Sequence, residues 1–242
     1  MDPQLGRLLG GGKEAEVFEY NGRVAKLYRR HAPKRSPFRE ASILTFVESL
    51  GLPAPAAYGV LEIEGRWAVI MDRIDGPLLA ETMRHDPAAI AAMAALQMRV
   101  HAQPAPPLAN LKAKLAANIA RATVLDEALR ANLLERLAAL PDGDRLCHGD
   151  FHPGNIVGPV GRETILDWLD ASRGDPAADV CRSYVLIKPQ SAGLAATYVD
   201  AYAAAASVSQ EAILNWLPFV AAARLAEGVT SEADGLMQMA GG

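Results

Sequence analysis

The sequence predicts a two-lobed α+β fold, with a small antiparallel sheet and one inserted helix followed by a larger, mainly helical part. Short segments of alternating polarity separated by glycine turns fill the first 75 or so residues. After Asp75-Gly76-Pro77 the apolar residues recur at helical spacing instead. Half of the 242 residues are hydrophobic, and alanine occurs in runs typical of helix-rich globular chains. We therefore expect one lobe over residues 1–75 and a second over 76–242.

The sheet is predicted from five short segments and the turns between them. Asn21-Gly22 is a strong signal for a type I′ hairpin turn, and Glu64-Gly65 separates a second pair of strands. Ser36 and Pro37 have the character of an N-cap and a first helical residue, so an inserted helix is expected over residues 38–48. The expected strands cover residues 5–10, 16–20, 23–28, 57–63 and 66–74.

The second lobe is predicted to be helical except for one segment. Between residues 145 and 171, polar glycine-rich loops alternate with two short apolar runs that are expected to pair as a small hairpin. Functional residues are concentrated in loops of this kind, held by a rigid scaffold. The expected helices cover residues 87–102, 108–123, 126–139, 176–187, 192–206 and 209–226.

Composition and charge exclude several classes of protein. A net charge of −4 without a dense basic patch argues against nucleic-acid binding. No stretch reaches about 18 consecutive apolar residues, and the N-terminus lacks the features of a secretory signal, so the expectation is a cytoplasmic protein without membrane partners. Cys147 and Cys181 are expected to be reduced, packed thiols.

The most informative stretch contains an Asp, an Asn five residues later, and a second Asp after an apolar strand. These residues are Asp150, Asn155 and Asp167. Phosphoryl transfer uses such a set: one carboxylate receives or orients the acceptor's hydroxyl proton, while the Asn oxygen and the other carboxylate bind Mg²⁺.

The pattern His148-Gly149-Asp150-x-His152-x-x-Asn155, with Ile165-x-Asp167-Trp168-x-Asp170, resembles the signature of the aminoglycoside phosphotransferase and choline kinase superfamily. The resemblance runs from Gly10 to about Tyr184 and implies a protein-kinase-like fold. It further implies that Asp150 is the catalytic base, that Asn155 and Asp167 bind Mg²⁺, and that ATP or GTP is the donor. Asp179 resembles the family residue that braces the catalytic loop through its backbone.

The first lobe is then expected to hold the nucleotide. Gly10-x-Gly12 lies between two strands and lets the backbone approach phosphates, although Ala15 replaces the third glycine of the kinase loop. Val17 is expected to pack on adenine. Val24 and Lys26 share one face of the next strand, which places an apolar surface beside an ammonium group for the phosphates.

Lys26 needs a counter-ion, and the inserted helix offers Glu40 and Glu48. Glu40 is the better candidate because it lies three and four residues from Ile43 and Leu44 on the inward face of the helix.

The end of the last strand is expected to border adenine, as in kinase relatives. Met71 would lie at the back of the pocket, and the Asp72 carbonyl and Ile74 amide would bond the base. From these residues alone, an apolar edge strand explains the segment equally well.

The acceptor is a small-molecule hydroxyl compound whose identity the sequence leaves open, as it leaves open the oligomeric state. Residues 140–242 carry thirteen acidic against six basic residues. Asp170, three residues beyond the proposed metal ligand, is the best candidate to attract an amine-bearing acceptor.

Three alternatives remain. His148, Asp150 and His152 could bind a transition metal in a hydrolase, or the chain could be a non-catalytic nucleotide-binding module. A protein kinase is disfavoured because no Ala-Pro-Glu segment follows Asp167. The remaining histidines are expected to be surface or capping residues, namely His31, His85 and His101.

Overall fold

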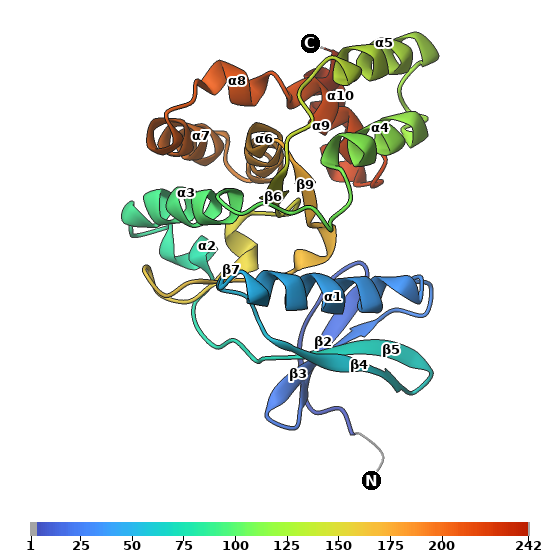
Figure 1. Ribbon diagram of the computed structural model, residues 1–242, viewed down its shortest axis with the longest axis vertical. Helices are drawn as coiled ribbons and strands as arrows, with labels where there is room; N and C mark the ends of the chain where they lie inside the picture. Colours follow the sequence, from blue (N-terminus) through green and yellow to red (C-terminus); the bar gives the residue numbers. More distant parts are fainter. Residues whose placement is uncertain (1–3, 242) are drawn as a thin grey trace. The chain divides into compact units, whose positions relative to one another are not determined.

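A five-stranded antiparallel sheet in the order β1-β2-β3-β5-β4 forms the first part of the chain, as the computed structural model of residues 4–241 shows (Figure 1). Asn21 and Gly22, which join two of its strands, both have positive φ angles, as the predicted type I′ turn requires. The strands are β1 (Leu8–Gly11), β2 (Ala15–Tyr20), β3 (Arg23–Tyr28), β4 (Ala57–Ile63) and β5 (Arg66–Met71).

The last strand is three residues shorter than predicted. This strand is β5, which ends at Met71. Met71 pairs with Ala57, the first residue of the antiparallel neighbour β4, so residues after Met71 have no further β4 residues to pair with. The Asp72 amide still bonds the Ala56 carbonyl, while the Asp72 carboxylate accepts from the Ala56 amide and the Tyr58 hydroxyl.

The inserted helix α1 (Arg35–Ser49) begins three residues earlier than predicted, and its N-cap is Lys34 without a side-chain cap bond. The prediction of Ser36 as the N-cap is therefore wrong. A turn in which the Ser36 amide bonds the Pro33 carbonyl leads directly into the helix. Pro37 is tolerated because first-turn residues need no amide donor.

Helices dominate the rest of the chain. A short helix α2 (Leu79–Thr82) and the C-terminal helix α10 (Ala233–Gly241) were not predicted. The single helix expected over residues 209–226 is two helices, because Pro218 has no amide to donate to the Leu214 carbonyl. The remaining helices are α3 (Ala88–His101), α4 (Leu111–Arg121), α5 (Glu127–Ala138), α6 (Pro176–Ile187), α7 (Ala192–Ala206), α8 (Gln210–Leu214) and α9 (Leu217–Leu225).

The segment between α5 and α6 contains two small sheets, in β6 (Arg145–Cys147) with β9 (Ser172–Gly174) and in β7 (Ile156–Val157) with β8 (Thr164–Ile165). The second pair is the predicted hairpin. Single 3-10 turns flank it at Pro153–Asn155 and Trp168–Asp170, and a third precedes α10 at Thr230–Glu232.

The described chain forms two compact units. The sheet unit consists of residues 4–82 together with Gly154–Leu169, and the helical unit consists of Met83–Pro153 together with residues 170–241. The hairpin thus belongs with the sheet: the Ile165 amide bonds the Pro53 carbonyl, and the Gly158 amide bonds the Pro77 carbonyl. No helix of the described residues is long and apolar enough to cross a membrane.

Candidate functional site

One face of the sheet carries the predicted nucleotide residues. Val17 lies opposite Lys26 across β2 and β3, and Val24 lies opposite Met71 across β3 and β5. Val69 lies opposite Lys26 on β5, and directly opposed residues share a face, so Val17, Val24, Val69 and Met71 lie on the same face as Lys26. The other face packs into the core of the sheet unit, which contains Ala25, Leu27, Ile63, Ala68 and Ile70.

Lys26 is held between two carboxylates. Its Nζ lies 2.6 Å from Glu40 Oε1 and 2.8 Å from Asp167 Oδ1. Glu40 is 1% exposed, and its second oxygen accepts from the buried Tyr28 hydroxyl. Burial by itself would lower the pKa of Lys26, but the charges of Glu40 and Asp167 raise it above the usual lysine value. The ammonium therefore stays charged and fixed in place.

Of the two glutamates offered by α1, the structure pairs Glu40 with Lys26, and Glu48 is exposed. Tyr28 was not among the predicted site residues. Its position two residues after Lys26, on the same face of β3, was the available signal.

Gly10, near the end of β1, and Gly12, just after it, have no structural need to be glycine. Neither Gly10 nor Gly12 has a positive φ, and a Cβ added to either would meet nothing within 4 Å. The Arg29 guanidinium donates to the Gly12 carbonyl at 3.2 Å and so holds the loop from outside. Ala15 is buried opposite Tyr28, so the replaced third glycine lies at the start of a paired strand.

The β7–β8 hairpin brings the two predicted metal ligands to neighbouring positions. The Leu166 amide bonds the Asn155 carbonyl at 2.8 Å, so Asn155 lies across the hairpin from the residue that precedes Asp167. Asp167 has a φ of 58°, and its side chain is 45% exposed. A positive φ at a non-glycine residue outside a hairpin turn or helix cap is strained, and such strain is typical of functional sites. Hard oxygen donors of this kind fit Mg²⁺.

The residues predicted to border adenine lie where β5 ends. Met71 is buried and Ile74 is half-buried. Asp72 is fixed through its carboxylate, which leaves the orientation of its backbone well defined.

Asp150 lies in the helical unit, in the loop that follows β6. Gly149 before it has a φ of 82°, and a Cβ there would lie 2.6 Å from the Asp170 carbonyl oxygen, so only glycine fits. Burial by itself would raise the pKa of Asp150, but the nearby His152, followed by Arg182 and His148, lowers it below the usual range. The carboxylate is thus ionised and able to accept a hydrogen bond from a hydroxyl group.

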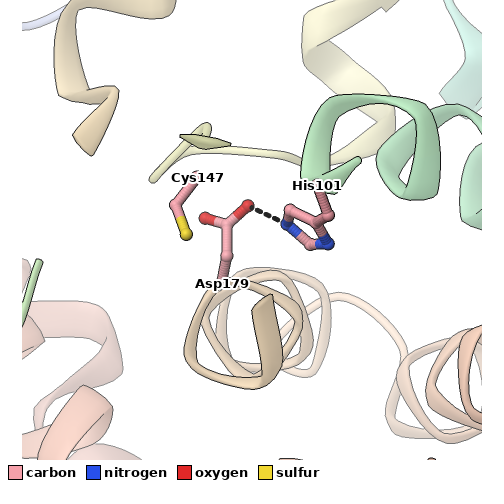
Figure 2. Close-up of side chains that lie close together, drawn as sticks. All are labelled: His101, Cys147 and Asp179. Carbon is pink, nitrogen blue, oxygen red and sulfur yellow. Dashed lines mark hydrogen bonds and ion pairs between the residues drawn. The ribbon is translucent and has the colours of Figure 1, made fainter. Parts of the chain in front are cut away.

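Asp179 braces this loop. Its two oxygens accept from the amides of His148 at 3.0 Å and Gly149 at 2.7 Å. His101 Nε2 also lies 3.0 Å from the carboxylate, as Figure 2 shows. The expectation that His101 is a surface or capping residue is therefore wrong: it is 5% exposed because the C-terminal end of α3 packs against α7. His31 and His85 are exposed, as expected.

Asp170, the proposed amine contact, and other acidic residues of the C-terminal segment have partners within the helical unit. Asp170 forms an ion pair with Lys114 at 2.5 Å, which lowers its pKa against the opposing effect of burial. Asp175 caps α6 through the Ala177 amide. Glu227 and Glu232 form ion pairs with Arg182 and Arg224. Much of the acidic excess in this part of the chain is therefore neutralised locally.

The alternative of a metal site at His148, Asp150 and His152 is not supported. His148 Nδ1 accepts from the Asp150 amide at 3.1 Å. Among the described residues, the side chains whose ligating atoms lie within 4.8 Å of one another are instead His101, Cys147 and Asp179 (Figure 2). Burial, and then the charges of Asp179 and Asp175, raise the pKa of the Cys147 thiol well above its usual value, so this cysteine is the packed thiol that was expected.

Comparison with known proteins identifies the fold. The family model described as "Phosphotransferase enzyme family" matches residues 6–212. The crystal structure of an aminoglycoside-3'-phosphotransferase of type VIII is similar, with a TM-score of 0.67, 20% identity, and coverage of 94% of this chain and 93% of that chain. A thermostable mutant of aminoglycoside phosphotransferase APH(4)-Ia, in ternary complex with AMP-PNP and hygromycin B, gives a TM-score of 0.69, 19% identity, and coverage of 98% and 89%.

A third similar structure is a putative aminoglycoside phosphotransferase from Ralstonia eutropha JMP134. It gives a TM-score of 0.66 at 17% identity and covers 99% of this chain and 89% of that chain. No curated protein matches the chain in sequence. The two-lobed α+β fold predicted from the sequence is confirmed by these similarities.

Proposed function

Because the chain belongs to the phosphotransferase enzyme family, we propose that it transfers the γ-phosphoryl group of ATP or GTP to a hydroxyl group of a small molecule. The observation that carries this proposal is the Lys26 ammonium, fixed between Glu40 and Asp167 on the apolar face of the sheet. Phosphoryl transfer needs positioned charge more than covalent chemistry, and a preorganised lysine supplies it.

The sheet unit holds the nucleotide in this proposal. The Gly10–Gly12 backbone and Lys26 contact phosphates, while Val17, Val24 and Met71 pack on the base and the backbone of Asp72 and Ile74 bonds its edge. Asn155 and Asp167 would hold Mg²⁺, which offsets the charge that develops on the phosphate oxygens. No side chain lies within 4 Å of a Cβ built at either glycine, so the backbone there is open to a ligand.

The helical unit supplies the base. Asp150 accepts or orients the hydroxyl proton of the acceptor, and its lowered pKa keeps it ionised throughout the neutral range. The expected division into a nucleotide lobe over residues 1–75 and an acceptor lobe over 76–242 stays a proposal. We refine this division in one respect: the proposed metal ligands Asn155 and Asp167 belong to the sheet unit, although they lie after residue 75 in the sequence.

The acceptor class is proposed only as far as a small hydroxyl compound. Hygromycin B is bound in one of the similar structures, so amine-bearing alcohols belong in the first screen. Asp170 remains the proposed amine contact, although its charge is shared with Lys114.

The test is a screen for acceptor-stimulated ADP or GDP release, using amino sugars, aminocyclitols, choline-like amines and neutral polyols. The expected result is release that depends on Mg²⁺ and on one acceptor class, and that disappears in Asp150→Asn. A non-catalytic nucleotide-binding module would bind Mg·ATP and release no product with any acceptor. Metal-dependent hydrolysis without a nucleotide would reject the proposal.

A further inference from the structure

Three helices of the helical unit enclose a layer of buried polar side chains. Each helix contributes two residues spaced four apart, which places both on one face. All six are at most 5% exposed: Gln97 and His101 on α3, Asp179 and Ser183 on α6, and Tyr198 and Tyr202 on α7. Such a layer is costly to bury unless its hydrogen bonds are complete.

Two chains of hydrogen bonds cross this layer and end on the same carboxylate oxygen. In the first, the Tyr202 hydroxyl lies 2.6 Å from His101 Nδ1, and His101 Nε2 lies 3.0 Å from Asp179 Oδ2. In the second, the Tyr198 hydroxyl donates to Gln97 Oε1, and Gln97 Nε2 donates to Asp179 Oδ2 at 2.9 Å.

The charge of Asp179 fixes the direction of the hydrogen bond between Asp179 and His101. Burial opposes ionisation, but His101, His148 and the Gly149 amide lower the pKa of Asp179 to about 2. An ionised carboxylate only accepts hydrogen bonds, so His101 Nε2 is the donor. The other ring nitrogen, Nδ1, pairs with the Tyr202 hydroxyl at 2.6 Å, which fixes the plane of the ring.

We propose that His101, held by Tyr202, is a positioning residue for the catalytic loop and acts through Asp179. The inference rests on the proposed function. Asp179 accepts from the amides of His148 and Gly149, and Gly149 directly precedes Asp150. Without the His101 donor the carboxylate loses a partner that fixes its rotamer, and both loop amides lose a fixed acceptor.

The same cluster does not suit a metal ion. The Asp179 oxygens already accept four hydrogen bonds, and a bound cation would compete with the two that hold the loop. Cys147 would have to ionise against a raised pKa. The bonds that Asp179 makes in this cluster therefore favour a role in positioning the loop over metal binding.

Four variants test the proposal: His101→Ala, His101→Gln, Tyr202→Phe, and the control Tyr184→Phe. The control removes a hydroxyl on α6 whose hydrogen-bond partner is Lys188, outside the layer. A positioning role predicts a kcat about tenfold or more lower in His101→Ala, because small misplacements of a reacting group are costly. In Tyr202→Phe the expected loss is about fivefold, typical of one hydrogen bond.

Two readouts separate positioning from simple destabilisation. The KM for ATP should stay unchanged in all variants, because Lys26, Glu40 and Asp167 belong to the sheet unit. His101→Gln should recover much of the lost kcat, since its amide can donate to Asp179. Unchanged kcat in His101→Ala, or the same loss in Tyr184→Phe, would overturn the proposal.

Hydrogen exchange measured on the peptide that contains residues 147–152 gives a readout independent of the substrate. Exchange at the His148 and Gly149 amides should be at least tenfold faster in His101→Ala and unchanged in Tyr184→Phe. This change in exchange is expected even if no acceptor is phosphorylated. The exchange measurement therefore tests the positioning role independently of the proposed function. Unaltered exchange in His101→Ala would overturn the positioning role, whatever the enzyme's activity.

Discussion

Asp150 and Asp167 are carboxylates of one predicted motif, yet their surroundings differ. Asp150 is 26% exposed with His152 Nε2 at 3.7 Å, whereas Asp167 is half-exposed, strained and ion-paired with Lys26. These environments suit a base and a metal ligand, respectively.

Exchanging each aspartate for asparagine should separate the two roles. Asp150→Asn should lower kcat by at least about 100-fold, the contribution of a general base, with the Kd for Mg·ATP unchanged. Asp167→Asn should weaken Mg·ATP binding by at least about tenfold, since even outer partners of a metal contribute this much. Calorimetric titration and steady-state kinetics check both. Near-normal turnover of Asp150→Asn would remove it from catalysis.

The buried Asp179 predicts an acid-dependent loss of stability. Its folded-state pKa of about 2 lies below the usual aspartate value, so its contribution is complete above about pH 4 and is lost as the pH falls toward 2. The shift corresponds to about 2 to 3 kcal/mol. Urea unfolding at pH 6, 4 and 3 should show the difference between the wild type and Asp179→Asn shrinking with acid. The exposed Asp234→Asn is the control. A constant difference would contradict this prediction.

At the scale of elements, the glycine segment at the end of β1, residues 10–12, contrasts with the hairpin turn at Asn21-Gly22. Gly10→Ala and Gly12→Ala should leave the melting temperature unchanged or slightly raised, because the new Cβ meets open space. Both should raise the KM for ATP if phosphates approach this backbone. Gly22→Ala should do the reverse, costing about 1 to 2 kcal/mol at its φ of 75° without altering the KM. Steady-state kinetics and thermal unfolding of all three variants test whether the phosphates approach this backbone. An unchanged KM for ATP in both Gly10→Ala and Gly12→Ala would place the phosphates elsewhere.

Helix α1 offers a matched pair of glutamates. Glu40→Gln removes the negative charge that pairs with Lys26 and that accepts the hydrogen bond of the Tyr28 hydroxyl. The affinity for Mg·ATP should therefore fall about tenfold, and the melting temperature should drop. Glu48→Gln, on the exposed side of the same helix, should change neither. Equal effects of the two substitutions would show that helix stability, rather than the ion pair, is being measured.

For the whole molecule, nucleotide binding should raise thermal stability before any acceptor is present. At a hundredfold excess of Mg·ATP over Kd the gain is about 2.7 kcal/mol, or roughly 5 to 10 °C for a chain of this size. Differential scanning fluorimetry with ATP and GTP, with and without Mg²⁺, measures it, and Lys26→Met serves as the weakened control. No shift with either nucleotide would contradict the kinase assignment.

The sequence by itself determined the features that depend on local chemistry. Period-two alternation and the Asn21-Gly22 turn identified the strands, and the motif around Asp150 identified the family. The choice of Glu40 over Glu48 also followed from sequence, because helical periodicity defines the buried face of α1.

Only the tertiary structure decided which residues far apart in the sequence are in contact. It placed Tyr28 against Glu40, Lys114 against Asp170, and His101 with Tyr202 behind Asp179. It also grouped the hairpin of residues 154–169 with the sheet. The physical reason is that burial and hydrogen bonding of a polar group depend on the packing of whole helices and strands. Local patterns give the face on which a residue lies, and the partner on that face comes from elsewhere in the chain.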